Sequence, residues 1–490
     1  MGIFANPLTD LLEYEDFSRD FLKGTDPVGM TGCIDSEKVH FMSTFLGEKK
    51  VQLVVTYNEQ RAREIEEDYK LFCSQVYVIP PRDLIFFSAD LQGNAIIAER
   101  MKAFAALYQN EAKVIITTID ALMSAAVPFE QLMSHVIKLK EGDELDLEKL
   151  KHDLTVMGYE RVGRVEEPGQ FTIHGGIADV YPLTMEIPVR IELWGDEIDT
   201  IRCFEPQSQR SMDQIESVSV FPAAEVIADD TARRRAVGMI QNELESQLAV
   251  FKKVKEPDKA KRLREETNRI LEALGEEVVL EAPDSYISYF YPRTVRLSEY
   301  FDEKNTLVFL DEPMRLKERG DGVQAEFEES MKNRLEQGFL LPGQTALLTP
   351  AKHVLAAFER GQVAALSSLD SRLADFTVVN SYAVNVQNMN TYREGFELLI
   401  KDLTHWKKEK YRIVLLCPSR TRANRIVNQL IEYDLLAYYS EDEDKKINPG
   451  EIMVTYGNLH RGFLYPMLKF AVITESDIFG VKKKKKEKKS

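Results

Sequence analysis

At the start of the chain, short apolar runs alternate with helical patterns, and this alternation limits the possible folds more than any other feature. VQLVVTY at 51–57 is typical of a buried parallel strand, and the segment after it carries Ile65, Tyr69 and Leu71 at helical spacing. VYVIP and KVIITT are further strand patterns, separated by a helical pattern that starts near Asn94. Strands and helices in this order predict a parallel sheet covered by helices.

The chain has 490 residues, too many for one hydrophobic core, and its patterns change at several points. Between 162 and 225, glycines and prolines separate short alternating strands such as QFTIHG and VRIELWG. This pattern indicates a β-rich module inserted into an α/β chain. Charged helical patterns follow at 230–275, and from 376 the strand pattern RIVLLCPS leads into the helical pattern RTRANRIVNQLIEY.

These changes predict an α/β protein in which a helicase-like parallel-sheet domain is interrupted by a β-rich domain and followed by a small α/β domain. Domain 1b is expected to complete the sheet that domain 1a begins. The expected parts are domain 1a (1–135), domain 2 (136–225), domain 1b (226–375), domain 3 (376–480) and a basic linker or tail (481–490).

The net charge of −17 argues against nonspecific DNA binding. Seven lysines and one glutamate occupy 482–489, so the rest of the chain carries a net charge near −23. A body this acidic repels a duplex over much of its surface. We interpret the lysine-rich tail as a solvated linker, and direct nucleic-acid binding through the tail and domain 1 is the alternative.

The four cysteines lie far apart without a CxxC pair, and the seven histidines form no HxH or HExxH arrangement. The sequence therefore predicts neither a disulfide framework nor a metal site. No apolar run reaches the roughly 18 residues of a membrane span. The N-terminal segment MGIFANPLTDLLEYEDF carries acidic residues and lacks the basic residues that begin a secretory signal. We therefore expect no secretory signal and a cytoplasmic location.

The segment PVGMTGCIDSEKVHFM begins like a phosphate-binding loop but departs from the GxxxxGK[ST] pattern at two positions. With the pattern started at Gly29, Gly32 falls inside the loop, and Ile34, Asp35 and Ser36 stand at the second glycine, the lysine and the hydroxyl residue. Ile34 does not easily take a positive φ, and Asp35 would repel a triphosphate. The sequence predicts a degenerate loop that does not hydrolyse nucleotide.

Asp311 and Glu312 end the strand pattern TLVFL and have the form of the acidic pair that holds Mg²⁺ in ATPases. Acids in this position can equally cap the helix that follows. Lys38 lies about 4.5 Å further along a helix than the expected lysine, so it would not meet the same phosphate oxygens. We expect a vestigial pair, no catalytic residue and no cofactor here; an ATPase that uses Lys38 with this pair is the alternative.

Three passages carry a family resemblance that extends over essentially the whole chain. They are PRDLIFFSADLQGNAIIAERMKAF, then EEPGQFTIHGGIADVYPLTMEIPVRIELWGDEIDTIRCFEPQSQRS with FPAAE, and finally GNLHRGFLYPMLKFAVITESDIFG. These passages closely resemble the N-terminal region of the bacterial transcription-repair coupling factors (Mfd). The match stops where the RNA-polymerase-interacting domain of that family would begin.

The resemblance implies a region similar to the nucleotide-excision-repair protein UvrB, with an inactive ATPase domain 1 and a domain 2 that binds UvrA. It also implies no damage-probing hairpin, since VYVIPPRDLIFFSADLQGN is short and has no tyrosine-rich insertion. RNA polymerase, DNA, ATP and Mg²⁺ are expected to bind downstream domains, including a translocase motor. The implied function is recruitment of DNA repair to RNA polymerase stalled at damage, and in the full-length family the C-terminal part conceals the UvrA surface.

The strand VRIELW puts its apolar side chains on one face and Arg190 and Trp194 on the other. Tryptophan and arginine are enriched among the side chains that dominate protein interfaces. The resemblance places the UvrA-contacting positions on His174, Arg190 and Trp194, where the family has arginine at the first position and phenylalanine at the third. We expect Arg190→Ala or Trp194→Ala to weaken UvrA binding with little loss of folding stability.

Structural alternatives stand beside this hypothesis. Arg190 could pair only with an acid on its own sheet, and Trp194 could pack beneath the helices of domain 1b. In domain 3, Ser419, Arg420 and Arg422 could bind an anion at a helix N-terminus, but capping and solvation are the expected roles.

Overall fold

The computed structural model describes residues 7–82, 92–275, 283–370, 376–392, 395–442 and 445–480. The lysine-rich tail at 481–490 lies outside the described residues, as does part of the segment VYVIPPRDLIFFSADLQGN, so the expectations for both stay predictions. None of the helices in the described ranges combines the length and apolar character that a membrane crossing needs.

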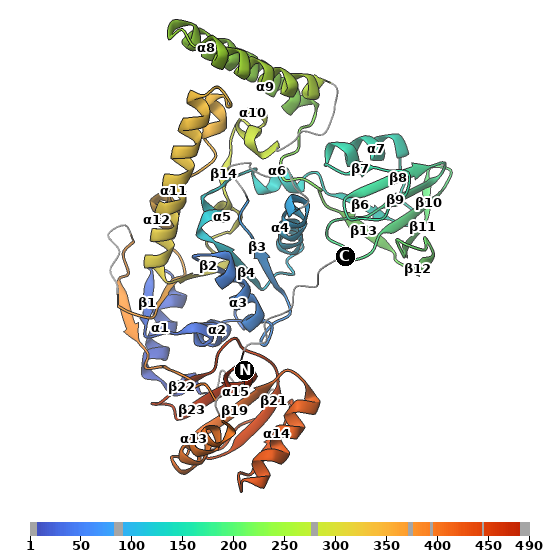
Figure 1. The fold of residues 1–490 in the computed structure, drawn as a ribbon. Coiled ribbons are helices and arrows are strands. Elements are labelled where there is room, and N and C mark those ends of the chain that lie inside the picture. Colours follow the sequence, from blue (N-terminus) through green and yellow to red (C-terminus); the bar gives the residue numbers. More distant parts are fainter. Residues whose placement is uncertain are drawn as a thin grey trace.

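Seven of the described strands form one large sheet, and every pairing within it is parallel (Figure 1). In sheet order they are β17 (Asn380–Ala383), β1 (Val28–Thr31), β16 (Val363–Ser367), β15 (Thr306–Asp311), β2 (Val51–Thr56), β4 (Val114–Thr118) and β3 (Val76–Ile79). Its strands come from both ends of domain 1, as expected for a domain interrupted by an insertion. The predicted α/β class is confirmed.

The expected boundary at 375/376 cuts through this sheet. β17 falls in the range assigned to domain 3, yet it pairs with β1 and forms the sheet edge. The short NSYA segment carries no long apolar run, so its pattern gave no sign of a strand. Domain 1 therefore extends beyond residue 375.

Both faces of the large sheet are buried. Successive residues of β2 alternate between two cores: Leu53 and Val55 belong to one, and Val54 belongs to the other. Burial on both faces explains why the strand sequences are continuous apolar runs rather than alternating ones. The helices of this domain are α1 (Leu12–Lys23), α2 (Asp35–Ser43), α3 (Glu59–Tyr69), α4 (Gln92–Tyr108), α5 (Ile119–Met123), α6 (Phe129–Met133), α10 (Ile287–Phe290), α11 (Pro313–Glu336) and α12 (Ala351–Ala356), with the short strand pair β5 (Ala125–Ala126) and β14 (Val295–Arg296).

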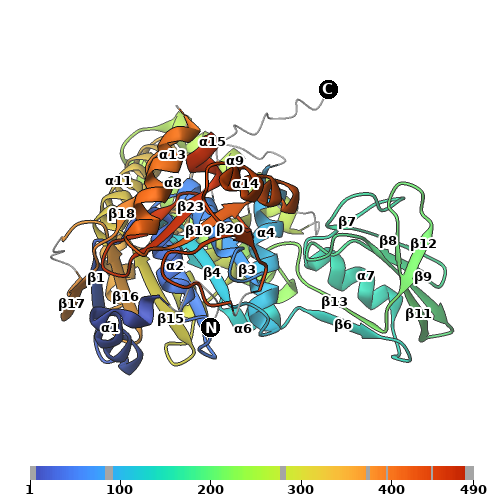
Figure 2. The same cartoon turned by 90° about the horizontal axis from the view of Figure 1, so that it is seen from below.

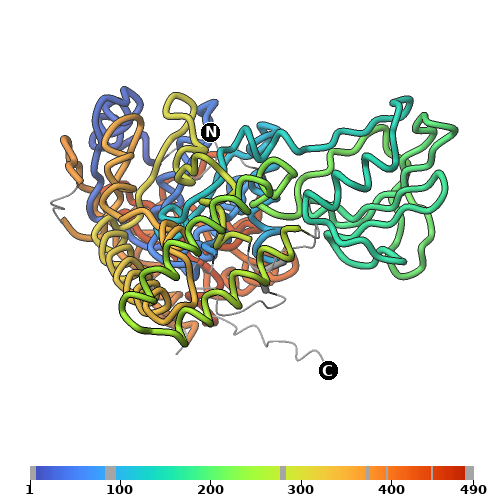
Figure 3. Tube along the Cα trace, turned by 90° about the horizontal axis from the view of Figure 1, so that it is seen from above, coloured from blue at the N-terminus to red at the C-terminus, as the bar shows by residue number. Residues whose placement is uncertain are grey.

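Two further helices form a long hairpin beside this domain. α8 (Asp230–Lys253) and α9 (Pro257–Gly275) run side by side, green in Figures 1 and 3, and pack through Ile240, Leu244 and Leu263. Apolar residues at helical spacing on each helix provide the contact.

Domain 2 stands to one side of the molecule (Figure 2). Its six-stranded sheet has the order β12 (Ser211–Gln214), β11 (Glu197–Phe204), β10 (Val189–Trp194), β9 (Ile177–Val180), β8 (Gln170–His174) and β7 (Glu160–Arg161). α7 (Leu147–Val156) and the strand pair β6 (Ile137–Lys140) and β13 (Ser217–Val220) cover one face, where Leu150, Leu154 and Ile191 share a core. We call this the inner face, and the opposite side the outer face.

A buried ion cluster fixes the chain where it leaves domain 2. Two guanidinium nitrogens of Arg100 on α4, Nε and Nη2, donate to Glu225 at 2.5 and 3.0 Å, and Arg100 is 1% exposed. Arg82 lies 3.7 Å from Glu225 and 2.7 Å from Asp284. Burial would raise the pKa of Glu225, but the charges of Arg100 and Arg82 hold it below its ordinary value.

Domain 3 has its own six-stranded sheet, flanked by α13 (Phe396–Lys408), α14 (Arg420–Glu432) and α15 (Glu475–Phe479). The strand order is β18 (Gln387–Asn388), β22 (Phe463–Tyr465), β23 (Phe470–Thr474), β19 (Arg412–Cys417), β21 (Ile452–Tyr456) and β20 (Ala437–Tyr439). One face packs against domain 1, since Phe463 and Phe470 share a core with Phe41 of α2.

We expect Glu225→Gln to lower the free energy of unfolding by about 3 kcal/mol, because it leaves the buried guanidinium of Arg100 without its carboxylate, whereas Arg82 keeps Asp284. Urea denaturation followed by circular dichroism measures this change. The control is Glu186→Gln, which removes an exposed partner of Lys102 and should cost less than about 1 kcal/mol. Equal effects of the two substitutions would contradict a structural role for the buried cluster.

Candidate functional site

The turn between β1 and α2 is too short to be a phosphate loop. Gly29 lies inside β1, where the sequence pattern placed the start of the loop, and only Gly32, Cys33 and Ile34 connect the strand to the helix. Asp35 is the first helical residue and has a φ of 27°. The predicted register of the degenerate loop is therefore wrong at Gly29, because the β1 strand extends through it.

The backbone groups that would face a phosphate are already occupied. The N–H of Cys33 donates to the carbonyl of Ser367 at 3.1 Å, and the N–H of Ile34 donates to Glu37 at 3.1 Å. Gly32 has a φ of +83°, and a Cβ there would lie 2.0 Å from the carbonyl oxygen of Val384. Close packing of the segment after β17, rather than a bound anion, explains this glycine.

Lys38 neutralises the acidic pair. Its Nζ donates to Asp311 Oδ1 at 2.7 Å and to Glu312 Oε1 at 2.6 Å, and its side chain is 4% exposed. Asp311 also accepts from Thr56 at 2.8 Å and lies 3.4 Å from Arg61 Nε. Burial alone would lower the pKa of Lys38, but the two carboxylates raise it, so the ammonium stays charged.

The same contacts set the charge of the acids. Burial would raise the pKa of Asp311, but Lys38 and Arg61 lower it to about 2. Glu312 precedes α11 with a φ of 54°, and its side chain makes no capping hydrogen bond to that helix. Helix capping therefore does not explain the acid at this position. A Mg²⁺-nucleotide would have to displace a buried ammonium group from both acids. The residues present do not fit that ligand.

The start of α2 is also the seam between domains 1 and 3. Ser36 Oγ accepts from the backbone N–H of Arg461 at 2.9 Å, and Tyr465 donates to Glu37 at 2.7 Å. Asp68 on α3 accepts from the backbone N–H of His460 at 2.5 Å. Polar groups at the position of the degenerate loop therefore hold a second domain.

On domain 2, the strand β10 has the predicted alternation. Val189 and Ile191 are fully buried in the inner core, while Trp194 is 84% exposed on the outer face. A bulge shifts the pairing with β11 between Glu192 and Leu193, and Trp194, the last residue of β10, follows Leu193. The indole does not pack beneath the helices of domain 1b, so that alternative is wrong.

Strand pairing places the three predicted residues on one face. His174 pairs with Ile177, and Ile177 pairs with Glu192, so these three side chains form a row across β8, β9 and β10. Arg190 lies two residues before this row and Trp194 two residues after it. His174 is exposed, and its Nε2 lies 3.0 Å from Thr172 Oγ1.

Arg190 is held by its own domain. Its Nε and Nη2 donate to the two oxygens of Asp179 at 2.8 and 2.7 Å, and its guanidinium lies 4.8 Å from the Phe204 ring centroid. The side chains of Arg190 and Asp179 are only 21% and 8% exposed. The pairing considered as the structural alternative for Arg190 is thus present.

Sequence reasoning missed three outer-face residues. Ile177 is 40% exposed beside His174, Asp179 holds Arg190, and Arg202 pairs with Arg190 across the β10–β11 ladder. The alternation of IADV and EIDTIRCF shows that these residues leave the inner face, but only the strand register shows their neighbours.

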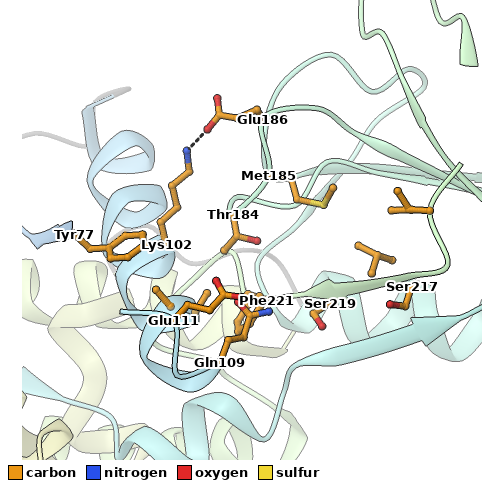
Figure 4. A pocket seen from close by; sticks show the side chains of 14 residues that line it. Tyr77, Lys102, Gln109, Glu111, Thr184, Met185, Glu186, Ser217, Ser219 and Phe221 are labelled. Carbon is orange, nitrogen blue, oxygen red and sulfur yellow. Dashed lines mark hydrogen bonds and ion pairs between the residues drawn. The ribbon is translucent and has the colours of Figure 1, made fainter. Parts of the chain in front are cut away.

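A cleft of about 410 Å³ lies between α4 and domain 2, away from these outer-face residues (Figure 4). Lys102 and Glu186 form an ion pair across it at 2.6 Å.

In domain 3, Ser419 accepts from the N–H of Arg422 at the start of α14, and Arg420 and Arg422 pair with Glu441 and Glu475. Ser419 thus caps the helix as expected, whereas the two arginines form ion pairs in addition to the expected solvation.

Comparisons with known proteins agree with this architecture. A family model described as the UvrB interaction domain matches residues 137–225, and a model described as the MFD, D3 domain matches residues 405–478. The transcription-repair-coupling factor of Bacillus subtilis is 29% identical over 99% of this chain and 41% of its own length. Those of Staphylococcus epidermidis and Staphylococcus haemolyticus are 27% and 28% identical, over 100% and 96% of the chain.

The chain resembles the transcription-repair coupling factors along its whole length. It spans about two fifths of the length of these relatives, 41% in the first two and 40% in the third. The resemblance inferred from the sequence passages is confirmed, and the matched UvrB interaction domain contains the outer face with His174, Arg190 and Trp194.

The seam between domains 1 and 3 should respond to pH. Burial raises the pKa of Glu37 to about 7, although bonds from Tyr465 and Ile34 oppose this shift. The folded protein therefore favours neutral Glu37, and its contribution to stability is full below about pH 4.5 and is lost as the pH rises through about 7. We expect Glu37→Gln to remove a pH-dependent loss of up to about 3 kcal/mol.

Urea unfolding of wild type and variant at pH 5 and pH 8, followed by tryptophan fluorescence, measures this difference. Trp406 in domain 3 is 9% exposed and reports on unfolding, whereas Trp194 is already exposed in the folded protein. The same pH dependence in both proteins would show that Glu37 does not titrate in this range.

Proposed function

We propose that this region recruits nucleotide excision repair by binding UvrA through the outer face of domain 2. The observation that carries the proposal is Trp194, an indole that is 84% exposed inside the matched UvrB interaction domain. A tryptophan in this position has no role in the core of its own domain. Burial of such a side chain in a partner often contributes ~2 kcal/mol or more.

The surroundings of Trp194 support an interface. Ile177, 40% exposed, adds apolar surface on the same face, and His174 and Glu192 lie in the adjoining row with polar groups. An apolar centre with polar neighbours is typical of the contact surface between two proteins. His174 is shorter than the arginine expected from the family, so it cannot provide the same bidentate contact with a carboxylate.

The proposal also includes the roles of a longer protein that contains this region. RNA polymerase and DNA would bind other parts of a longer protein, which would also contain the ATP- and Mg²⁺-dependent motor. Contact with the C-terminal part of that protein would cover the UvrA surface until the motor engages DNA. Domain 2 suits such regulation, because its outer face has no cover from domain 1 or domain 3 among the residues that the structure describes.

We expect Trp194→Ala to weaken UvrA binding by about 30-fold while leaving the thermal unfolding midpoint unchanged. Isothermal titration calorimetry with purified UvrA measures the affinity. The matched control is Leu436→Ala, which removes a 74% exposed side chain from domain 3 and should bind like the wild type. An unchanged affinity of the Trp194 variant would refute the proposed docking face.

Arg190→Ala is a poorer test than the sequence suggested. The substitution leaves Asp179, 8% exposed, without the guanidinium that holds both of its oxygens. We expect a loss of about 3 kcal/mol in the stability of domain 2, in contrast to the small loss predicted from the sequence. Thermal denaturation of this variant beside Trp194→Ala distinguishes the two cases, and equal midpoints would contradict the structural role of Arg190.

We also propose that this region performs no nucleotide chemistry. Support comes from the short β1–α2 turn, its occupied amides and the Lys38 ion pairs. The alternative, an ATPase with a variant loop, requires measurable ATP binding that Asp311→Ala abolishes. Equilibrium dialysis with labelled ATP and Mg²⁺ is expected to detect no bound nucleotide in the wild type at concentrations up to about 1 mM, the upper end of typical enzyme KM values.

A further inference from the structure

Arg202 lacks the partner that its neighbour Arg190 has. The two arginines face each other across the antiparallel β10–β11 ladder, with Asp179 on the other side of Arg190. Both oxygens of Asp179 are engaged by Arg190. Arg202 is partly buried, and its Nε is a buried donor without a hydrogen bond. Among the described residues it forms no ion pair.

This arrangement is unfavourable within the domain alone. Like charges directly opposite each other in an antiparallel ladder destabilise the pair, and a buried donor without an acceptor is costly. Glu192, the acid on the neighbouring row of β10, accepts a hydrogen bond from Thr200 at 3.2 Å rather than from Arg202. The domain therefore presents a guanidinium whose hydrogen-bonding capacity is not used.

We propose that Arg202 is a docking residue that binds an acidic side chain of the partner protein. The inference rests on the proposed function, because it assigns a second contact on the same outer face. A carboxylate matches the planar fork of a guanidinium group and would pair with the terminal nitrogens of Arg202, which are not among its buried atoms. The occupant is an aspartate or glutamate of UvrA, placed between the Arg190–Asp179 pair and the exposed edge of β12.

The strand register sets the distance between the Arg202 contact and the indole of Trp194. Arg202 lies in the Arg190 row, and Trp194 lies four residues further along β10. At about 3.3 Å per residue, the two contacts are roughly 13 Å apart. The partner should therefore present an apolar pocket for Trp194 and an acidic side chain roughly 13 Å away from it.

A phosphate of nucleic acid is a less suitable occupant. Glu192, Glu197 and Asp199 lie on the two strands that carry the arginine and the indole, in a chain with a net charge of −17. These acids would repel a continuous row of phosphates but leave room for one carboxylate.

Titration of the whole chain with UvrA tests the proposal. We expect Arg202→Gln to weaken binding by about tenfold and to reduce its dependence on salt, because a charge-assisted contact is lost. The control is Arg161→Gln, which removes an exposed arginine from β7 on the far edge of the same sheet. It should bind UvrA with wild-type affinity.

A cross-link identifies the carboxylate directly. A carbodiimide joins an amine to a carboxylate at direct contact, with loss of water, so Arg202→Lys should yield a peptide that couples position 202 to an Asp or Glu of UvrA. Mass spectrometry detects that peptide. Arg161→Lys, treated in the same way, should yield no cross-link to UvrA from position 161.

The outcomes separate this inference from the proposed function. Loss of binding in Trp194→Ala, with Arg202→Gln unchanged and no cross-link from Arg202→Lys, would overturn the role of Arg202 and leave the docking face intact. No binding of UvrA to the wild type would overturn the proposed function itself. If Arg202→Gln lowers affinity for duplex DNA but not for UvrA, the occupant is a phosphate and the proposal is wrong.

Discussion

The ion pairs between Lys38 and the two acids at the end of β15 determine how the rest of domain 1 can be used. Asp311 and Glu312 are placed by a central strand of the large sheet, where an ATPase would hold Mg²⁺. A buried ammonium, with Arg61 beside it, satisfies them instead. Because removal of one partner from such a buried pair is strongly destabilising, a nucleotide could reach these acids only by breaking contacts that maintain the fold.

The adjoining end of α2 contacts a second domain. Ser36, Glu37 and Asp68 bind backbone and hydroxyl groups of domain 3, and aromatic side chains of both domains share one core. Domains 1 and 3 are therefore joined by polar and apolar contacts together. Domain 2 is joined mainly where its chain ends, at the buried Arg100–Glu225 cluster, so its outer face stays accessible.

Local pattern was enough to predict some of these features and not others. The period of two in VRIELW predicted that Trp194 leaves the core, because this depends only on neighbours within one strand. The salt bridge of Arg190 depends on which strand pairs with β10 and in which register, and sequence alternation does not determine either. Lys38 and Asp311 are 273 residues apart, so their contact follows from the order of strands in the sheet. The edge strand β17 was missed because its residues have no apolar pattern.

The outer face of domain 2 combines two kinds of residue that the rest of the domain does not need. An indole that is 84% exposed adds nothing to the inner core, and a second arginine opposite Arg190 opposes folding of the sheet. Residues that cost stability without serving the fold are expected where a protein performs its function. In an acidic chain, a face that combines exposed apolar surface with an unpaired guanidinium suits a partner with an apolar pocket and one carboxylate better than a row of phosphates.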